Sequence, residues 1–326
     1  MHSVFITRKI PDAGLKMLEG ACNVSINPAD RSLSKKEIVG ELKGKGALLC
    51  MLSDQIDADV IKASRQLKVI ANYGVGYNNI DVAAATSRGI AVTNTPGVLT
   101  DATADLAWAL LFAAARRIAE GDRMVRTGKF NGWSPTMMLG QDVQGKILGI
   151  IGAGRIGTAF ALKSKGFKMD VLYYANHRNE VLEKELGAKK VALDELLKVA
   201  DFVSLHVPLT PETRHLIGER ELRTMKKTAV LVNTARGPVI DEKALAKALK
   251  EKWIFAAGLD VYENEPMVNE ELLLLDNVVL APHIGSATVE TRSRMAMMAA
   301  ENIIAALEGK VPPNCVNPEY TKFRKR

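Results

Sequence analysis

Short apolar runs alternate with segments of helical periodicity along most of the chain. In the first hundred residues we expect strands at 3–7, 24–26, 47–52, 68–71 and 90–93, and helices at 12–19 and 34–42, the second opened by a serine cap. Buried strands that alternate with helices form parallel sheets with both faces covered. This part of the chain therefore predicts an α/β unit.

A second unit of the same kind is predicted from about residue 100. It opens with an alanine-rich helix at 101–118, which is apolar on nearly every side and is expected to be buried. Residues 127–145 are rich in Gly, Pro and Met and are expected to be irregular. The later elements are strands at 147–151, 171–174, 202–206, 230–233, 256–260 and 278–281, and helices at 155–164, 242–250 and 289–308.

The strand at 147–151 runs directly into the motif G-x-G-x-x-G, formed by Gly152, Gly154 and Gly157. The motif is weak alone, but here it follows an apolar strand and opens a helix, which is the context that dinucleotide binding requires. The first glycine allows the tight turn, the second admits a pyrophosphate and the third lets helix and strand pack closely. The alternative is a purely structural turn in another α/β protein.

The end of the next strand indicates which dinucleotide is bound. NAD sites usually carry Asp or Glu there, about 20 residues beyond the glycines. Here the strand is followed by Asn176, His177 and Arg178, and Arg178 offers a guanidinium to a 2′-phosphate. We therefore expect NADP(H) to be preferred and NAD(H) to be possible. The alternative is that Arg178 is only a solvated charge of the loop.

Three ionisable residues follow predicted strands of the second unit: Arg236, Glu265 and His283. Ligands of open α/β sheets bind at the carboxyl ends of the strands, so the three side chains are expected to converge there. A histidine donates a proton near neutral pH, and a carboxylate beside it favours the protonated ring. A guanidinium holds a carboxylate and polarises a carbonyl. The set suffices to reduce a 2-oxo acid.

Each assignment has an alternative on the residues alone. Glu263 competes with Glu265, and spacing does not choose between them. Asp260, at a strand end, is a candidate for contact with the nicotinamide amide. His206 and His215 are expected to be structural, as most histidines are.

Composition and charge narrow the class of protein. Of 326 residues, 47% are hydrophobic and 25% charged, which is the balance of a globular chain, and its length favours two domains. The net charge of +7 owes four positive charges to residues 322–326, which we expect to form a disordered tail. Aromatic residues make up only 5% of the chain, and no basic patch with interleaved aromatic residues occurs. A nucleic-acid partner is therefore not expected.

The same sequence argues against a membrane or secreted protein. The longest uncharged apolar run, 106–115, is too short to span a bilayer, and the N-terminus lacks the apolar stretch of a secretory signal. Three cysteines, Cys22, Cys50 and Cys315, are widely spaced and match no metal motif. We expect reduced thiols and a cytoplasmic location.

Taken together, these segments resemble the D-isomer-specific 2-hydroxyacid dehydrogenase family, within it the glyoxylate/hydroxypyruvate reductase and 2-ketogluconate reductase branch. The matching segments are 72–81, 94–100, the glycine motif, 206–213, and those around Arg236, Glu265 and His283. The resemblance implies a Rossmann nucleotide domain at 99–287 and a discontinuous, flavodoxin-like substrate domain at 1–98 and 288–326. It also implies reduction of a small 2-oxo acid to the D-2-hydroxy acid.

The resemblance assigns further residues. It selects Glu265, directly before a proline, as the partner of His283, and it places the substrate against Leu52, Val75 and Gly76. It implies cofactor contacts at Thr103, Arg155, Ile156, Val207, Pro208, Thr213, Thr234, Ala235, Arg236, Asp260, His283 and Gly285.

The family also implies a homodimer formed through the nucleotide domain, with the segment 127–145 reaching the partner through Trp133, Met137 and Met138. A formate dehydrogenase is disfavoured because that branch replaces the glutamate by glutamine. The residues leave two rival functions open: a phosphoglycerate dehydrogenase without a regulatory domain, and a nucleotide-sensing corepressor that resembles the C-terminal binding proteins. The latter would bind a peptide without turnover.

Overall fold

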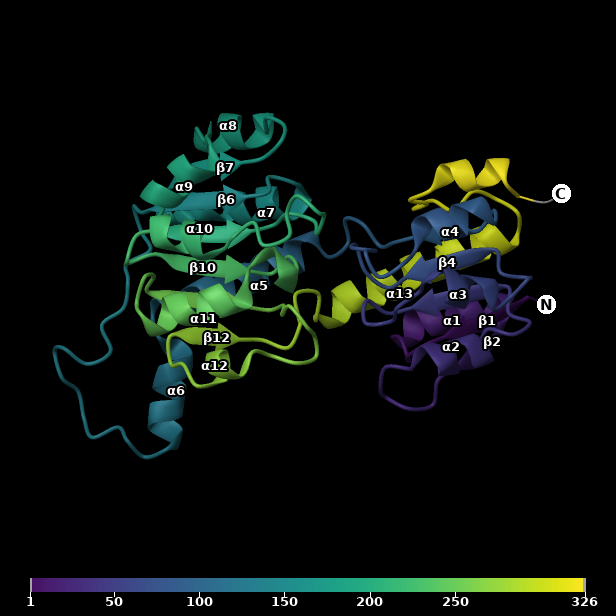
Figure 1. Ribbon diagram of the computed structural model, residues 1–326, viewed down its shortest axis with the longest axis horizontal. Helices are drawn as coiled ribbons and strands as arrows, with labels where there is room; N and C mark the ends of the chain where they lie inside the picture. The colour runs from purple at the N-terminus through teal and green to yellow at the C-terminus, as the bar shows by residue number, and fades with distance from the viewer. Residues whose placement is uncertain (1, 325–326) are drawn as a thin grey trace. The chain divides into compact units, whose positions relative to one another are not determined.

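The computed structural model describes residues 2–324 (Figure 1). The chain folds into two compact units. Residues up to 99 and residues from 286 onward form the first unit, and Thr100–Gly285 form the second. No helix in the described part of the chain combines the length and the apolar character that crossing a bilayer requires.

The first unit is built on a five-stranded parallel sheet in the order β2-β1-β3-β4-β5. Relative to the chain this is the order 2-1-3-4-5, the flavodoxin-like arrangement that the resemblance implies. Its strands are β1 (Ser3–Ile6), β2 (Asn23–Ile26), β3 (Ala47–Cys50), β4 (Val69–Asn72) and β5 (Ala91–Thr93). Its helices are α1 (Asp12–Ala21), α2 (Lys35–Glu41), α3 (Ala58–Lys62), α4 (Val82–Ser87) and α13 (Val289–Leu307).

Helices cover both faces of this sheet. On one face α1 and α13 bury Leu18, Ala296 and Ile303 against the strands. On the other face α2 and α3 bury Ile38 and Val60. Because α13 helps to cover one face, the core of the first unit needs residues that follow the whole second unit in the chain.

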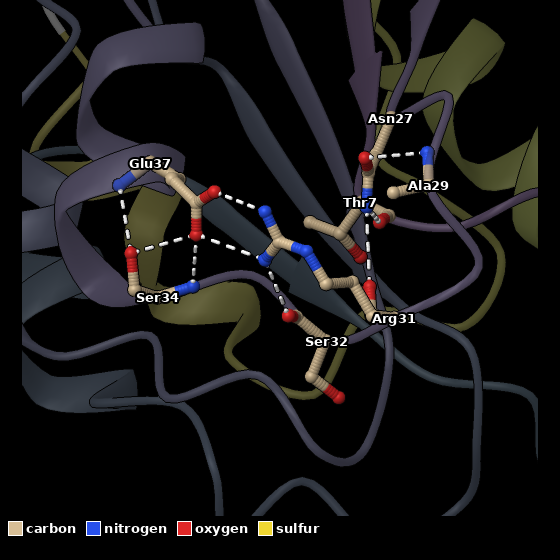
Figure 2. Close-up of polar contacts among 7 residues, drawn as sticks. All are labelled: Thr7, Asn27, Ala29, Arg31, Ser32, Ser34 and Glu37. Carbon is tan, nitrogen blue, oxygen red and sulfur yellow. Dashed lines mark hydrogen bonds and ion pairs between the residues drawn. The ribbon is translucent and has the colours of Figure 1, made fainter.

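Local signals explain where these helices begin. Ser34 caps α2, as the sequence predicts, and the structure adds a reciprocal capping box with Glu37. Figure 2 shows the Arg31 guanidinium on the carboxylate of Glu37, while its Nη1 also donates to the carbonyl of Ser32 at 3.1 Å. The loop before α2 is thus held to the first turn of the helix.

The expected disordered tail is wrong for the residues that the structure describes. The 3₁₀ turn Pro318–Lys322 buries Tyr320, and Nη1 of Arg324 donates to the Gly309 carbonyl at 3.0 Å. A buried aromatic side chain anchors this segment to the first unit, a contact that charge alone does not reveal. The last two residues of the predicted tail, 325 and 326, lie outside the described part.

The second unit has a seven-stranded parallel sheet in the order β12-β11-β10-β9-β6-β7-β8. Numbered within the unit this is 7-6-5-4-1-2-3, the Rossmann order with one further strand at the edge. The strands are β6 (Ile147–Ile151), β7 (Asp170–Tyr174), β8 (Lys189–Lys190), β9 (Phe202–Leu205), β10 (Val230–Asn233), β11 (Ala256–Leu259) and β12 (Val278–Leu280). The predicted fold class, two parallel α/β sheets, is therefore confirmed.

Two helical layers enclose this sheet (Figure 1). One layer contains α5 (Thr100–Ala115), α7 (Arg155–Lys163) and α8 (Glu180–Leu186), and its core includes Trp108, Leu111 and Phe160. The other contains α9 (Leu193–Val199), α10 (Glu219–Thr224) and α11 (Glu242–Lys250). The helices α6 (Ile118–Arg126) and α12 (Glu270–Leu273) complete the unit, with 3₁₀ turns at Ser164–Phe167 and Gly237–Val239.

The single helix predicted at 101–118 is wrong only in its last three residues. α5 is buried as expected, but it ends at Ala115, and α6 begins at Ile118 after Arg117 takes the left-handed conformation at φ 53°. The apolar run stops at Arg116, but arginines also occur within helices, so the sequence gave no sign of the change in direction. Helices α3, α4, α8, α9, α10 and α12 were also not predicted, because each has only four to seven residues and is too short to show a period.

Candidate active site

The glycine motif lies where the strand order of the second sheet reverses, at the carboxyl ends of β6 and β9. Gly152 has φ +97°, and a Cβ there would lie 2.7 Å from the backbone carbonyl carbon of His206. A Cβ on Gly157 would lie 2.0 Å from the carbonyl oxygen of Gly152. Both positions therefore accept only glycine, because a side chain would have to displace backbone.

Gly154 has a different reason to be glycine. It precedes α7 with no side-chain cap, and no atom lies within 4 Å of the position that its Cβ would take. Arg155 and Ile156 form the first turn of α7 and present its backbone amides. An uncapped helix start beside open space is the arrangement that receives a pyrophosphate. This part of the structure fits a dinucleotide.

The three residues expected to read the adenosine end, Asn176, His177 and Arg178, are all exposed and follow β7. In the structure the guanidinium of Arg178 is paired with the carboxylate of Glu183 on α8. Glu183 also accepts a 2.5 Å hydrogen bond from the Tyr173 hydroxyl. The bonds from Arg178 and Tyr173 lower the pKa of Glu183 to about 2, so the carboxylate stays ionised beside Arg178.

Sequence reasoning missed Asn179, which joins this loop to the glycine turn. Its side chain accepts from the Leu182 amide and so caps α8, and its amide group donates to the Ala153 carbonyl at 2.9 Å and the Thr158 hydroxyl at 2.7 Å. The signal that could have found it is an asparagine directly before the helical segment 180–186.

Arg236, Glu265 and His283 follow β10, β11 and β12, which are adjacent strands of the sheet. Nδ1 of His283 lies 2.8 Å from Oε2 of Glu265, and the other carboxylate oxygen accepts from the Tyr262 amide at 3.1 Å. The Arg236 guanidinium donates to the Ala235 carbonyl at 2.7 Å, and its charge acts on Glu265. The structure thus brings the three predicted side chains together.

The charges of these groups depend on one another. Burial raises the pKa of Glu265, but the hydrogen bond and charge of His283, the Tyr262 amide and the charge of Arg236 together hold it below its usual value. Burial lowers the pKa of Arg236, and the charge of Glu265 works against that change. A guanidinium titrates so high that Arg236 keeps its charge near neutral pH. The site therefore holds an ionised carboxylate between two basic side chains.

Asp260 is buried at the end of β11 and holds the segment after His283. Its two carboxylate oxygens accept from the amides of Ile284 and Gly285, both at 2.7 Å. Burial raises the pKa of Asp260, against the lowering effect of these amides and of the His283 charge. A Cβ on Gly285 would lie 3.4 Å from the methyl carbon of Thr103, so Thr103, Asp260 and Gly285 lie together.

The remaining predicted cofactor residues lie at the ends of β9 and β10. A Cβ on Gly152 would lie 2.8 Å from Cγ1 of Val207, and the Thr213 hydroxyl donates to the Pro208 carbonyl at 2.6 Å. The Ala235 amide donates to the Asn233 side chain at 3.0 Å. The hydroxyl of Thr234 is buried without a hydrogen-bond partner. A buried hydroxyl left unsatisfied at this edge fits a site that a polar ligand completes.

The two histidines expected to be structural differ from His283. The imidazole of His206 bonds to the Ser204 hydroxyl at 2.9 Å, and burial lowers its pKa to about 3. His215 lies 2.6 Å from Oε1 of Glu263. The carboxylate of Glu263 is therefore paired with His215, whereas that of Glu265 is paired with His283.

The three predicted substrate residues, Leu52, Val75 and Gly76, belong to the first unit. They follow β3 and β4, which are neighbours in that sheet. The Asn94 side chain donates to the Val75 carbonyl at 2.8 Å, and the Asn72 side chain donates to the Gly76 carbonyl at 2.7 Å. A Cβ on Gly74 would lie 2.6 Å from a methyl carbon of Leu52, so Leu52 packs directly on this loop. Their contact with substrate stays a prediction.

A Rossmann sheet with a glycine turn at its switch point and a His–Glu–Arg cluster at the same edge defines a nicotinamide-dependent oxidoreductase. The family model described as "D-isomer specific 2-hydroxyacid dehydrogenase, NAD binding domain" matches residues 108–285. The chain belongs to the D-isomer specific 2-hydroxyacid dehydrogenase family. It is an oxidoreductase with an NAD(P)-binding domain.

Three similar proteins are all named as reductases of glyoxylate or hydroxypyruvate. The chain is 57% identical to a glyoxylate reductase of Korarchaeum cryptofilum over 98% of this chain and 97% of that protein, and 54% identical to one of Thermococcus kodakarensis over 99% and 98%. It is 31% identical to an NADPH-dependent glyoxylate/hydroxypyruvate reductase of Sinorhizobium meliloti, solved with NADP and malonate, with a TM-score of 0.88 over 100% and 99% of the two chains. The corepressor and phosphoglycerate dehydrogenase functions find no support among these relatives.

Proposed function

We propose that this enzyme reduces glyoxylate, hydroxypyruvate or a similarly small 2-oxo acid, such as 2-ketogluconate, to the D-2-hydroxy acid. The observation that carries the proposal is the 2.8 Å contact between His283 and Glu265, beside Arg236 in the unit that holds the glycine turn. The relatives named glyoxylate reductase support the choice of substrate class.

The roles of the three side chains follow from their contacts. A bound nicotinamide dinucleotide supplies the hydride. Because Nδ1 of His283 faces Glu265, Nε2 is the nitrogen free to give a proton to the substrate oxygen. Glu265 fixes the ring and favours its protonated form. Arg236 binds the substrate carboxylate and polarises the carbonyl, with Leu52, Val75 and Gly76 proposed as further substrate contacts.

We propose NADP(H) as the preferred cofactor. No carboxylate follows β7 directly, and Arg178 and its neighbours offer donors to a 2′-phosphate. The solved relative described as NADPH-dependent supports this preference. Because Arg178 is paired with Glu183, a 2′-phosphate must either share the guanidinium with that carboxylate or displace the carboxylate from it.

We further propose a homodimer formed through α6 and the segment 127–145. Figure 1 shows this segment as a long loop that leaves the body of the second unit. Trp133 is 80% exposed and Phe130 and Leu139 are also exposed, whereas the end of the loop is tied back by the Gln141 amide to the Ala115 carbonyl at 2.8 Å. An anchored loop with several exposed apolar side chains is typical of an interface.

A cytoplasmic location also stays a proposal. Cys22 and Cys50 are buried thiols and Cys315 is half-buried, and none forms a disulfide. Reduced cysteines suit a reducing compartment.

The direct test is the oxidation of NADPH and NADH by the purified enzyme with glyoxylate, hydroxypyruvate and 2-ketogluconate. We expect turnover with at least one of these acids, faster with NADPH at limiting cofactor, and a product of D configuration. No turnover of any small 2-oxo acid would overturn the proposal, and turnover of only a larger acid would correct its substrate class.

A further inference from the structure

Glu242 is a buried carboxylate close to the site that none of the roles above uses. It is the first residue of α11 and is only 6% exposed. Its carboxylate accepts a hydrogen bond from the backbone amide of Glu263, and its own amide donates to the Glu263 carboxylate at 3.4 Å. The start of α11 and the chain after β11 are thus joined by a reciprocal pair of bonds.

The same carboxylate lies near a second point of that segment. The Asn269 backbone amide also lies near this carboxylate and, together with the Glu263 amide, opposes the rise in the pKa of Glu242 that burial causes. Between these two points the chain forms a tight turn, closed by the Met267 amide on the Asn264 carbonyl at 3.0 Å. Glu265 lies in this turn.

Other contacts leave this segment little freedom on its inner side. A Cβ on Gly237 would lie 1.9 Å from the backbone of Tyr262, so the loop after Arg236 packs directly against the start of the turn. The charged groups around Glu242 are Glu263 and Glu265 on the turn, His215 and Arg214 on Glu263, and Arg236 on Glu265. Glu242 is the member of this group whose carboxylate holds the backbone two residues before Glu265.

We propose that Glu242 is a positioning residue for the reduction: its carboxylate holds the backbone at the start of the turn that carries Glu265 and so keeps Glu265 against His283. This inference rests on the proposed roles of Glu265 and His283. Glu242 itself touches neither substrate nor cofactor in this proposal. Its loss acts on kcat through the orientation of the imidazole, and not on cofactor affinity.

The test is a double-mutant cycle with Glu242→Gln, Glu265→Gln and both together, with Glu251→Gln, an exposed site at the other end of α11, as the matched control. Gln keeps the shape of the side chain but only one acceptor oxygen. Because one buried hydrogen bond contributes about 1–1.5 kcal/mol, we expect kcat to fall roughly tenfold in Glu242→Gln, with the KM for NADPH unchanged. The alkaline limb of the pH–rate profile should move in the same direction as in Glu265→Gln.

The cycle separates positioning from general structural support. If Glu242 acts through Glu265, the double variant loses little more activity than Glu265→Gln alone. Additive losses, or a wild-type kcat and pH profile in Glu242→Gln, would overturn the inference. If Glu242→Ala does not fold, the Gln variant still decides. If Glu265→Gln and His283→Ala themselves retain wild-type kcat, the proposed catalytic assignment fails, and this inference fails with it.

Discussion

The carboxylate of Asp260 accepts a 2.7 Å hydrogen bond from the backbone amide of Gly285, so the end of β11 fixes the turn that follows β12. His283 opens this turn in the left-handed conformation, at φ 53°. That conformation is uncommon for a residue with a side chain and persists where the surroundings hold it. Asp260 therefore supports the backbone on which His283 stands.

We expect Asp260→Ala to destabilise the enzyme by about 2 kcal/mol, because it leaves one buried and one partly buried amide without an acceptor. Asp260→Asn keeps one acceptor and should cost less. Denaturant unfolding measures both. The control is Asp276→Ala, which removes an exposed ion pair with Arg123 and should change stability by less than about 1 kcal/mol. Equal effects at the two positions would contradict this account.

His283→Ala should reduce kcat by roughly 10²–10⁴-fold, the contribution of a positioned acid–base group. Glu265→Gln should cost less, and the alkaline limb of its pH–rate profile should move to lower pH because the neutral amide no longer favours a charged ring. His2→Ala, at an exposed histidine of the first unit, serves as the control. Near-normal turnover in His283→Ala would remove the proposed proton donor.

Arg178→Ala should raise the KM for NADPH by about 10-fold or more while the KM for NADH changes little, since a charge-assisted hydrogen bond contributes about 1.5–3 kcal/mol. Steady-state kinetics with both cofactors measure the difference. Arg220→Ala, at an exposed arginine paired with Asp194, is the matched control. Equal changes with the two cofactors would show that Arg178 does not recognise the 2′-phosphate.

Trp133→Glu should shift the enzyme from dimer toward monomer, because it places a charge among the apolar side chains of the proposed interface. Sedimentation analysis over a range of protein concentrations measures the shift. Leu274→Glu is the control, since Leu274 is 85% exposed on the same unit but lies next to α12, outside the segment 127–145. Identical sedimentation of both variants and the wild type would count against this interface.

His206 should make stability depend on pH. Burial lowers its pKa from 6.5 in the unfolded chain to about 3 in the folded one. Between these pH values the unfolded state binds a proton on His206 more readily than the folded state does. The free energy of unfolding therefore has its full value above about pH 6.5 and declines as the pH falls toward 3. The slope should be up to about 1.4 kcal/mol per pH unit.

Unfolding free energies of the wild type and of His206→Gln, measured from pH 7 down to about pH 4, isolate this contribution. The variant should show a shallower slope, and His2→Gln should keep the slope of the wild type. The same slope in all three proteins would mean that His206 is not buried in its neutral form.

Much of the fold could be predicted from the sequence, because strands and helix starts are marked by residues close together in the chain. Apolar runs marked the central strands within two residues, and Ser34 marked the start of α2. The break at Arg117 and the short helices could not be predicted, since a left-handed residue and a four-residue helix leave no period to detect. The order of the basic tail could not be predicted either, because it depends on the burial of Tyr320, which the charges of the tail do not indicate.

The sequence by itself determined which groups stand at the strand ends: the three glycines, Arg236, the two glutamates and His283. Spacing alone could not choose between Glu263 and Glu265, because both follow the same strand two residues apart. The family resemblance selected Glu265, and the tertiary structure shows the physical difference, with Glu263 on His215 and Glu265 on His283. The partners come from other strands, and their meeting depends on how the turn between Glu263 and Asn269 is held, which is a property of packing and not of residue order.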